Sequence, residues 1–263
     1  MKQALESDEV YPMKYTTLAF LFLASVLSAK GQGQVSKEVL PMSLFQFQFG
    51  GYAPYGDMAE FYGPFGSGGF SFALKTKSNF IFGADFNYFF SNNVNDADTR
   101  FNELRFENGL VVGNEGEFID VIVQKRGFAA GLYAGKIFNL FGPNPNSGLE
   151  LRLGVNFLEH RTYIESREAD IPPLEDEYRA AYDRKRAGFA AYQFVGYRNF
   201  SNSRFANFFI GADFYQAFTV DYRTYNVDQM EFTDGNYFDF IVGLKAGWVI
   251  PIYKQVDDRF YIQ

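Results

Sequence analysis

The sequence predicts an all-β protein, an eight-stranded antiparallel up-and-down transmembrane β-barrel, with a ten-stranded barrel as the alternative. Eight segments show the period-two alternation of strands, with apolar residues set against small or polar ones. Short and long connections alternate between these segments. Aromatic residues, which favour strands, make up 20% of the chain. Together these observations are typical of a barrel that crosses a membrane with its strands.

Each predicted strand is about as long as a tilted membrane-crossing strand must be. In chain order the segments are 43–52, 69–76, 79–91, 128–138, 147–161, 187–197, 206–218 and 237–250. The fifth has the clearest pattern, because leucine, valine or phenylalanine occupies every second position from Leu149 to Phe157. Its other face carries Glu150, Arg152 and Asn156. In the fourth and sixth segments the faces are mixed, so the pattern does not assign an inside and an outside.

The connections predict the orientation of the barrel. The long, polar ones lie at 53–68, 92–127, 159–186 and 219–236. The shorter ones, such as the turn predicted at 198–205, are rich in Gly, Asn, Ser and Pro. Outer-membrane barrels have tight periplasmic turns and longer outer loops, so we expect both termini on the periplasmic side.

One long connection contains a pattern of its own. Segments 104–112 and 117–123 also alternate, and they flank the turn Gly-Asn-Glu-Gly. We expect a hairpin that rises above the membrane and continues into the fourth strand. The ten-stranded alternative would use these two segments as barrel strands instead.

The polar face indicates that lipid, not water, surrounds the barrel. A water-facing sheet carries many Lys, Glu, Thr and Arg residues, whereas this face is mostly Gly, Ala, Ser, Asn and Gln with scattered charges. Such residues suit the narrow interior of an eight-stranded barrel, which side chains fill. A soluble secreted β-barrel is the alternative. The charged residues predicted to form a polar network inside are Asp85, Glu150, Arg152, Asp213, Asp239 and Lys245.

Charges inside the barrel must be paired and hydrogen-bonded. Glu150 and Arg152 are expected to share partners on neighbouring strands, and Lys245 to pair with Asp239 or Asp213. The uncharged polar residues expected inside are Gln46, Gln48, Asn87, Asn156 and Asn207. On the outside, aromatic residues at strand ends predict interfacial girdles. The candidates for the periplasmic girdle are Phe80, Phe82, Phe138, Phe205 and Trp248.

Residues 1–31 are predicted to be an N-terminal extension and a secretory signal peptide. The apolar run at 18–29 is too short to span a bilayer comfortably, and small and polar residues follow it. The first twelve residues contain three acidic side chains, which do not suit a signal peptide, so Met13 is expected to be the true start. The outer-membrane β-barrel is then 40–263, and the expected location is the cell outer membrane.

The composition excludes several kinds of site. Without cysteine the chain has no disulfide and no catalytic thiol, and no metal or cofactor motif is present. The acidic residues of the long connections match no known calcium loop. A net charge of −7 argues against a nucleic-acid partner. His160, the only histidine, has Glu159 beside it and Ser166 nearby, but we expect an exposed or hydrogen-bonded loop histidine and no catalytic residue.

Three segments together with the signal peptide carry a family resemblance: QKRGFAAGLYAGKIF at 124–138, GPNPNSG at 142–148, and the tail at 243–263. Over about residues 40–263 the chain resembles the small outer-membrane β-barrel proteins of the Bacteroidota. The resemblance implies an outer-membrane barrel and allows an accessory role in type IX secretion, gliding or barrel assembly. Many outer-membrane barrels end on an aromatic residue, whereas this chain ends Phe-Tyr-Ile-Gln. The last strand is expected to end near Ile250, because Pro251 cannot donate a ladder hydrogen bond, so the tail after it is expected in the periplasm.

The expected function is therefore non-enzymatic. We expect a barrel with a side-chain-filled interior that is structural or an accessory subunit of an envelope complex. The expected partners are the lipid bilayer and lipopolysaccharide, and envelope proteins that contact the outer loops or the periplasmic tail. A lipid-modifying enzyme that uses His160 is the alternative, and a narrow channel is the third hypothesis.

Overall fold

The computed structural model describes residues 38–95, 111–112, 118–119, 121–166, 183–202, 206–223, 225–226, 231–232 and 235–252. The barrel lies in one compact unit, Gln34–Lys254, and only this unit is described below. The predicted signal peptide and the residues after Ile252 lie outside the described residues. So do the loop acids considered as calcium ligands, which are Glu115, Glu117, Asp120, Asp170, Glu175, Asp176 and Glu177.

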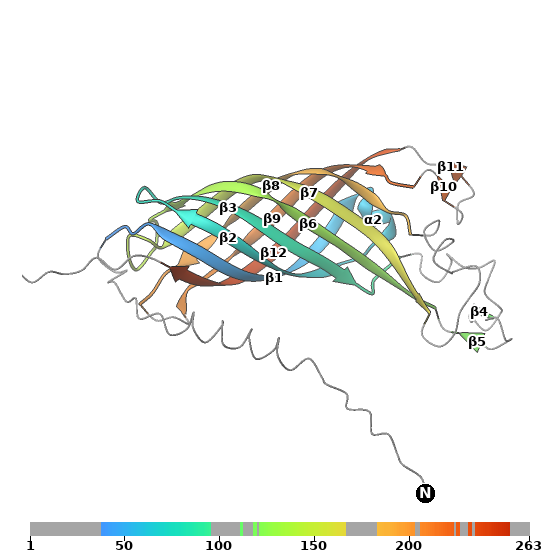
Figure 1. Ribbon diagram of the computed structural model, residues 1–263, viewed down its shortest axis with the longest axis horizontal. Coiled ribbons are helices and arrows are strands. Elements are labelled where there is room, and N and C mark those ends of the chain that lie inside the picture. The colour runs from blue at the N-terminus through green and yellow to red at the C-terminus, as the bar shows by residue number, and fades with distance from the viewer. Residues whose placement is uncertain are drawn as a thin grey trace, which may run out of the picture. The chain divides into compact units, whose positions relative to one another are not determined.

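Eight strands close into one antiparallel barrel (Figure 1). Their bounds are β1 Met42–Gly56, β2 Phe65–Lys75, β3 Phe80–Ser91, β6 Val121–Phe138, β7 Gly148–Ser166, β8 Arg186–Asn199, β9 Phe208–Asp221 and β12 Asn236–Ile252. Consecutive barrel strands pair with each other, and β1 pairs with β12 to close the ring. The predicted fold class is therefore confirmed, and closure removes the free sheet edges that an open sheet would expose.

The ten-stranded alternative is wrong. Of the two extra segments, the parts that the structure describes add no strand to the ring: β4 (Val111–Val112) pairs with β5 (Phe118–Ile119) in a separate sheet, and residues 121–123 belong to β6. These two strands flank the predicted turn, so the expected hairpin is present, and β6 begins just after it. A second small sheet, outside the barrel, pairs β10 (Tyr225–Asn226) with β11 (Glu231–Phe232).

Half of the connection predicted at 53–68 is strand. β1 continues to Gly56 and β2 begins at Phe65, so only the short helix α2 (Met58–Phe61) and its flanks lie between them. The glycines and prolines of this region are typical of a loop. However, Tyr52 and Phe65 are cross-strand partners whose rings stack with centroids 5.5 Å apart. This aromatic pair inside the barrel stabilises the longer strands.

Five other strands, β6, β7, β8, β9 and β12, extend beyond at least one predicted end. β6 starts seven residues before Phe128, and β7 reaches Ser166, so both continue into what the sequence indicated as loops. β12 passes through Pro251 to Ile252 instead of ending at Ile250, and Pro251 is paired with Leu44. Proline cannot donate a ladder hydrogen bond, but at the end of a strand that loss is tolerated.

The two faces of the barrel are inverted relative to a soluble sheet. On β7, Leu153 and Val155 are 67% and 60% exposed, whereas Glu150 and Arg152 are 0% and 1% exposed. An exterior of exposed apolar side chains around a closed barrel is the arrangement of outer-membrane proteins. The chain is therefore placed in the outer membrane, with its apolar residues against lipid. Among the described residues, no helix is long and apolar enough to cross a membrane.

A row of phenylalanines crosses the exterior of several strands. Centroids of neighbouring rings lie 5.5 to 6.1 Å apart. The members of this aromatic row are Phe70, Phe86, Phe128, Phe157 and Phe189. At the other end of the strands, Phe80, Phe82 and Phe138 of the predicted periplasmic girdle are exposed and Trp248 is half-buried. Phe205 lies outside the described residues.

Replacing Leu153 with arginine tests the lipid-facing assignment. Leu153 is the central residue of the outward-facing apolar positions between Leu149 and Phe157 on β7, and it is exposed. In a bilayer the charge would lie inside the apolar band, between its midplane and its periplasmic boundary, so we expect the free energy of unfolding to fall by about 1–3 kcal/mol. Urea titration of the barrel folded in lipid vesicles measures this, with Leu140→Arg in the β6–β7 turn as the control. Equal stability of both variants and the wild type would contradict a lipid-facing Leu153.

Candidate functional site

Large rings fill the barrel interior where the neighbouring strand carries glycine. Tyr133 on β6 is paired with Gly83 on β3, and a Cβ added to Gly83 would lie 2.6 Å from the Tyr133 ring. Tyr52 on β1 is paired in the same way with Gly243 on β12. The glycine-rich polar face of the sequence thus leaves room for tyrosine rings. Their hydroxyl groups take part in the polar contacts of the interior.

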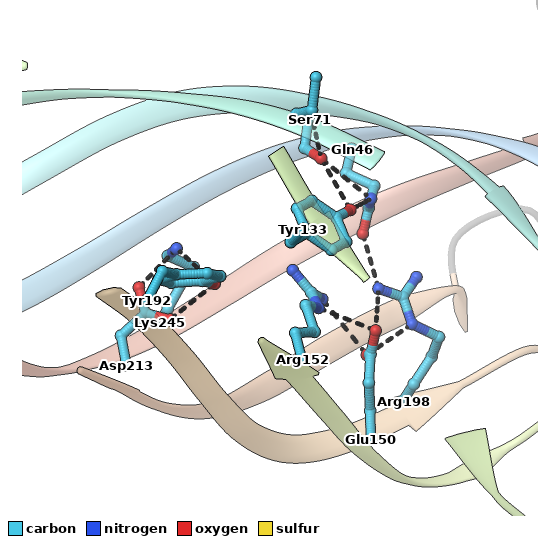
Figure 2. A network of polar contacts seen from close by, with 10 residues as sticks. Gln46, Ser71, Tyr133, Glu150, Arg152, Tyr192, Arg198, Asp213 and Lys245 are labelled. Atoms are coloured by element: carbon cyan, nitrogen blue, oxygen red, sulfur yellow. Dashed lines mark hydrogen bonds and ion pairs between the residues drawn. The ribbon is translucent and has the colours of Figure 1, made fainter. Parts of the chain in front are cut away.

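Glu150 is held between two arginines at the end of the barrel that carries the termini. Arg152 and Arg198 donate from Nε to its carboxylate oxygens at 2.8 and 2.7 Å, and each adds a second bond from Nη2 at 3.2 Å. Figure 2 shows both guanidinium groups directed at this carboxylate. The Arg152 guanidinium also lies 4.3 and 4.4 Å from the ring centroids of Phe194 and Phe209. One buried carboxylate and two aromatic faces therefore stabilise two buried cations.

Uncharged side chains extend this cluster across the barrel. Arg198 donates from Nη2 to Gln46 Oε1 at 2.7 Å. Gln46 Nε2 donates to the hydroxyl oxygens of Tyr133 and Ser71 at 3.1 and 3.3 Å, as drawn in Figure 2. These bonds connect β1, β2, β6, β7 and β8, so the cluster joins strands that are not neighbours in the ring.

Asp213 is the centre of a second cluster, nearer the middle of the strands. It forms an ion pair with Lys245, and the hydroxyl groups of Tyr52, Tyr192 and Tyr215 donate to its oxygens at 2.9, 3.0 and 3.4 Å. Lys245 Nζ also donates to Tyr192 and Tyr215 at 3.3 Å. Of the two pairings predicted for Lys245, the structure contains the one with Asp213.

Asp85 is satisfied by amides instead of a cation. Asn87 Nδ2 and Asn156 Nδ2 donate to its two oxygens at 2.8 and 3.2 Å, and Gln48 Nε2 donates to Asn87 Oδ1 at 2.8 Å. Within the described part of the chain, Asp85 has no ion-pair partner. Its carboxyl group is therefore held by a chain of hydrogen bonds that runs from β1 to β7.

Asp239 pairs with His160 near the other end of the barrel. Nε2 of His160 lies 3.0 Å from Asp239 Oδ2, which also accepts from Thr219 Oγ1 at 2.6 Å. His160 is 1% exposed, so the expectation of a loop histidine is wrong about its position, although it is hydrogen-bonded as expected. Glu159, the acidic neighbour of His160 in the chain, lies on the outward face of β7, whereas His160 faces inward.

The geometry gives the enzyme hypothesis no support. Ser166 lies six residues beyond His160 on β7, which is about 20 Å along a strand. A nucleophile and its base must lie within hydrogen-bond distance. His160 is also buried beneath Tyr62, whose ring centroid is 5.6 Å away. No group of three metal-binding side chains occurs among the described residues.

The end of the barrel opposite the termini is closed by α2 and the residue after it. Met58 and Tyr62 are buried, and the Tyr62 hydroxyl lies 2.9 Å from Thr162 Oγ1. Lys125 is fully buried below them, with Nζ 3.1 Å from Met58 Sδ and 3.2 Å from the Phe65 ring centroid.

Outside the membrane-spanning strands, hydrogen bonds to Asp183 raise the pKa of Arg223 and hold the segments at 183–185 and 222–223 together.

The end that carries the termini is closed as well. Lys75 donates from Nζ to the Leu40 carbonyl and to Asn146 Oδ1 at 2.9 and 2.8 Å. The backbone N–H of Phe200 donates to Ser147 Oγ at 2.8 Å. Asn146, Ser147 and Phe200 are all buried. The β6–β7 and β8–β9 turns therefore fold over the interior at this end.

All six residues predicted for the interior network are buried inside the barrel, but they fall into separate clusters. Glu150 contacts Arg152, Asp213 contacts Lys245, and Asp85 and Asp239 each have other partners. The five uncharged residues expected inside are also buried.

Arg198 is the main functional side chain that the sequence analysis missed. It was predicted to start a turn, because Asn, Phe and Ser follow it, whereas it is fully buried on β8. Continuing the alternation of Tyr192, Phe194 and Gly196 by one step would have placed it inside. Tyr133 and Tyr192 were missed because their strands show mixed faces.

No family model matches the chain, and no curated protein matches it. Among solved structures, the chain is similar to the attachment invasion locus protein Ail of Yersinia pestis, in complex with the heparin analogue sucrose octasulfate. The two are 10% identical with a TM-score of 0.40, and the match covers 80% of this chain and 99% of Ail. Neisserial surface protein A is 10% identical to this chain, with a TM-score of 0.41, and the match covers 79% of this chain and 96% of that protein. The outer membrane protein OprG of Pseudomonas aeruginosa is 9% identical to this chain, with a TM-score of 0.40, and the match covers 82% of this chain and 98% of OprG. These values are too low to carry an argument, so the assignment as an outer-membrane barrel rests on the strands and faces described above.

Proposed function

We propose that this chain is a non-enzymatic, non-conducting outer-membrane barrel that serves as a structural or accessory subunit of an envelope complex. The observation that carries the proposal is the filled interior, in which buried ion pairs and tyrosines occupy successive levels of the barrel. A barrel closed at both ends presents only its outer loops, its periplasmic tail and its lipid-facing surface to other molecules. Its role is then to hold those surfaces at the membrane.

Electrical recording tests the first half of this proposal. The purified full chain, reconstituted in planar bilayers, is expected to give no stepwise conductance, because buried side chains at both ends of the barrel leave no open path for ions. Reproducible single-channel steps from the folded protein would favour the narrow-channel hypothesis instead.

Crosslinking in native membranes followed by co-purification tests the second half. We expect a stable envelope protein to be recovered with the wild-type chain, and to be lost when the segment 167–182 is replaced by a Gly-Ser linker or the chain is ended after Ile252. Conductance and folding of both variants serve as controls. Recovery of no stable partner from the wild type would contradict the subunit role.

A further inference from the structure

Two arginines face each other on the outside of the barrel. Arg126 on β6 and Arg161 on β7 are register partners. Arg126 is two residues from the lipid-facing Phe128, and Arg161 is four residues from the lipid-facing Phe157. An even spacing along a strand places side chains on the same face, so both arginines are on the outer face. Both residues are partly exposed. Side chains of directly paired residues lie with their Cβ atoms about 5 Å apart.

Like charges in this position are unfavourable unless an anion lies between them. Arg126 donates to Gln124 Oε1 and to the Lys125 carbonyl, and the Arg161 guanidinium lies 5.9 Å from the Tyr163 ring centroid. Among the described residues, neither arginine forms an ion pair with a carboxylate. The carboxylate nearest in the register, Glu159, is paired with Lys185 at 3.1 Å. The surface therefore keeps an excess of positive charge in a chain whose net charge is −7.

The position of this pair along the strand matches the level of lipid headgroups. On the outer face of β6, Phe128, Ala130, Leu132 and Ala134 separate Arg126 from Lys136 without another charge. Ten residues of strand span about 33 Å, which at a tilt of about 40° gives a height of about 25 Å. This is the height of the apolar band of an outer-membrane barrel. Arg126 and Arg161 thus lie at the boundary opposite the termini, just beyond the aromatic row.

We propose that Arg126 and Arg161 form a binding site for the phosphate of a phosphorylated glycolipid of the outer leaflet. A guanidinium group binds phosphate through two parallel hydrogen bonds, so two facing guanidinium groups present a fork on each side of one phosphate. The acyl chains of the lipid would lie along the aromatic row and the leucines below it. This site depends on the membrane placement of the barrel and not on its closed interior.

Lipid binding to the folded full chain in detergent tests the site, with native mass spectrometry as the measurement. The probes are bisphosphorylated lipid A, the same lipid without phosphates, and inorganic phosphate as a competitor. Arg126→Gln combined with Arg161→Gln is expected to raise the Kd for bisphosphorylated lipid A about tenfold or more, because several charge-assisted hydrogen bonds are lost. Lys136→Gln is the matched control, since it removes an exterior cation from the other end of the same strand.

The outcomes separate clearly. A Kd raised in the double variant but not in Lys136→Gln, with weak binding of dephosphorylated lipid, would support the site. An unchanged Kd in the double variant, or equal losses in both variants, would overturn it. Displacement of the lipid by equimolar inorganic phosphate would overturn the assignment to a lipid. Heat-dependent gel mobility verifies that each variant is folded, and silent or open conductance has no bearing on this result.

Discussion

Replacing Glu150 with glutamine is expected to lower the free energy of unfolding by about 3–5 kcal/mol. The carboxylate accepts four hydrogen bonds from Arg152 and Arg198, and all three side chains are 0–1% exposed. A glutamine keeps the shape but removes the negative charge, so two guanidinium groups would remain buried without a counter-ion. An uncompensated buried charge costs much more than the net gain that the ion pair provides.

Urea titration of the barrel folded in vesicles measures this effect. Glu159→Gln on the same strand is the matched control, because its pair with Lys185 is partly exposed and is expected to contribute less than about 1 kcal/mol. If both variants were equally stable, the buried cluster would not be the stabilising element that its geometry indicates.

Asp213→Asn is expected to destabilise the barrel by about 3 kcal/mol, since Lys245 would then be buried without its counter-ion. Three tyrosine hydroxyl groups also donate to Asp213, and each would lose a charged acceptor. Replacing Lys245 with methionine in the same chain removes the unpaired cation while keeping similar volume. The double variant is therefore expected to regain most of the lost stability.

A double-mutant cycle in vesicles gives the coupling free energy of this pair. The four chains are the wild type, Asp213→Asn, Lys245→Met and the combination, each measured by urea titration. A double variant that is as unstable as the sum of the two single changes would show that the ion pair is not what couples these strands.

The stretch Leu149–Phe157 shows how much of the fold local patterns could predict. Its alternation fixed two faces, and the small, sparsely charged residues of the other strands identified the polar face as the inner one. The same reasoning placed Glu150, Arg152, Asp213 and Lys245 inside the barrel. Alternation has a period of two along every strand, so a few clear strands are enough to assign a barrel and its faces.

The strand ends could not be predicted in this way. Residues near Gly56 and Phe65 have the composition of turns, but the Tyr52–Phe65 contact across β1 and β2 outweighs that preference. Local composition reports only the intrinsic preference of a segment, whereas cross-strand packing depends on a partner elsewhere in the chain.

By itself, then, the sequence determined the barrel architecture, with eight strands favoured over ten, the lipid-facing exterior and the identity of most polar residues inside. Only the tertiary structure decided which of them meet. Arg198 forms an ion pair with Glu150, Asp213 pairs with Lys245, and Asp239 pairs with His160. On the outer face, Arg126 lies opposite Arg161. Partner choice depends on strand register and on the curvature of the closed ring, which bring together residues from distant parts of the chain. No pattern along a single strand contains that information.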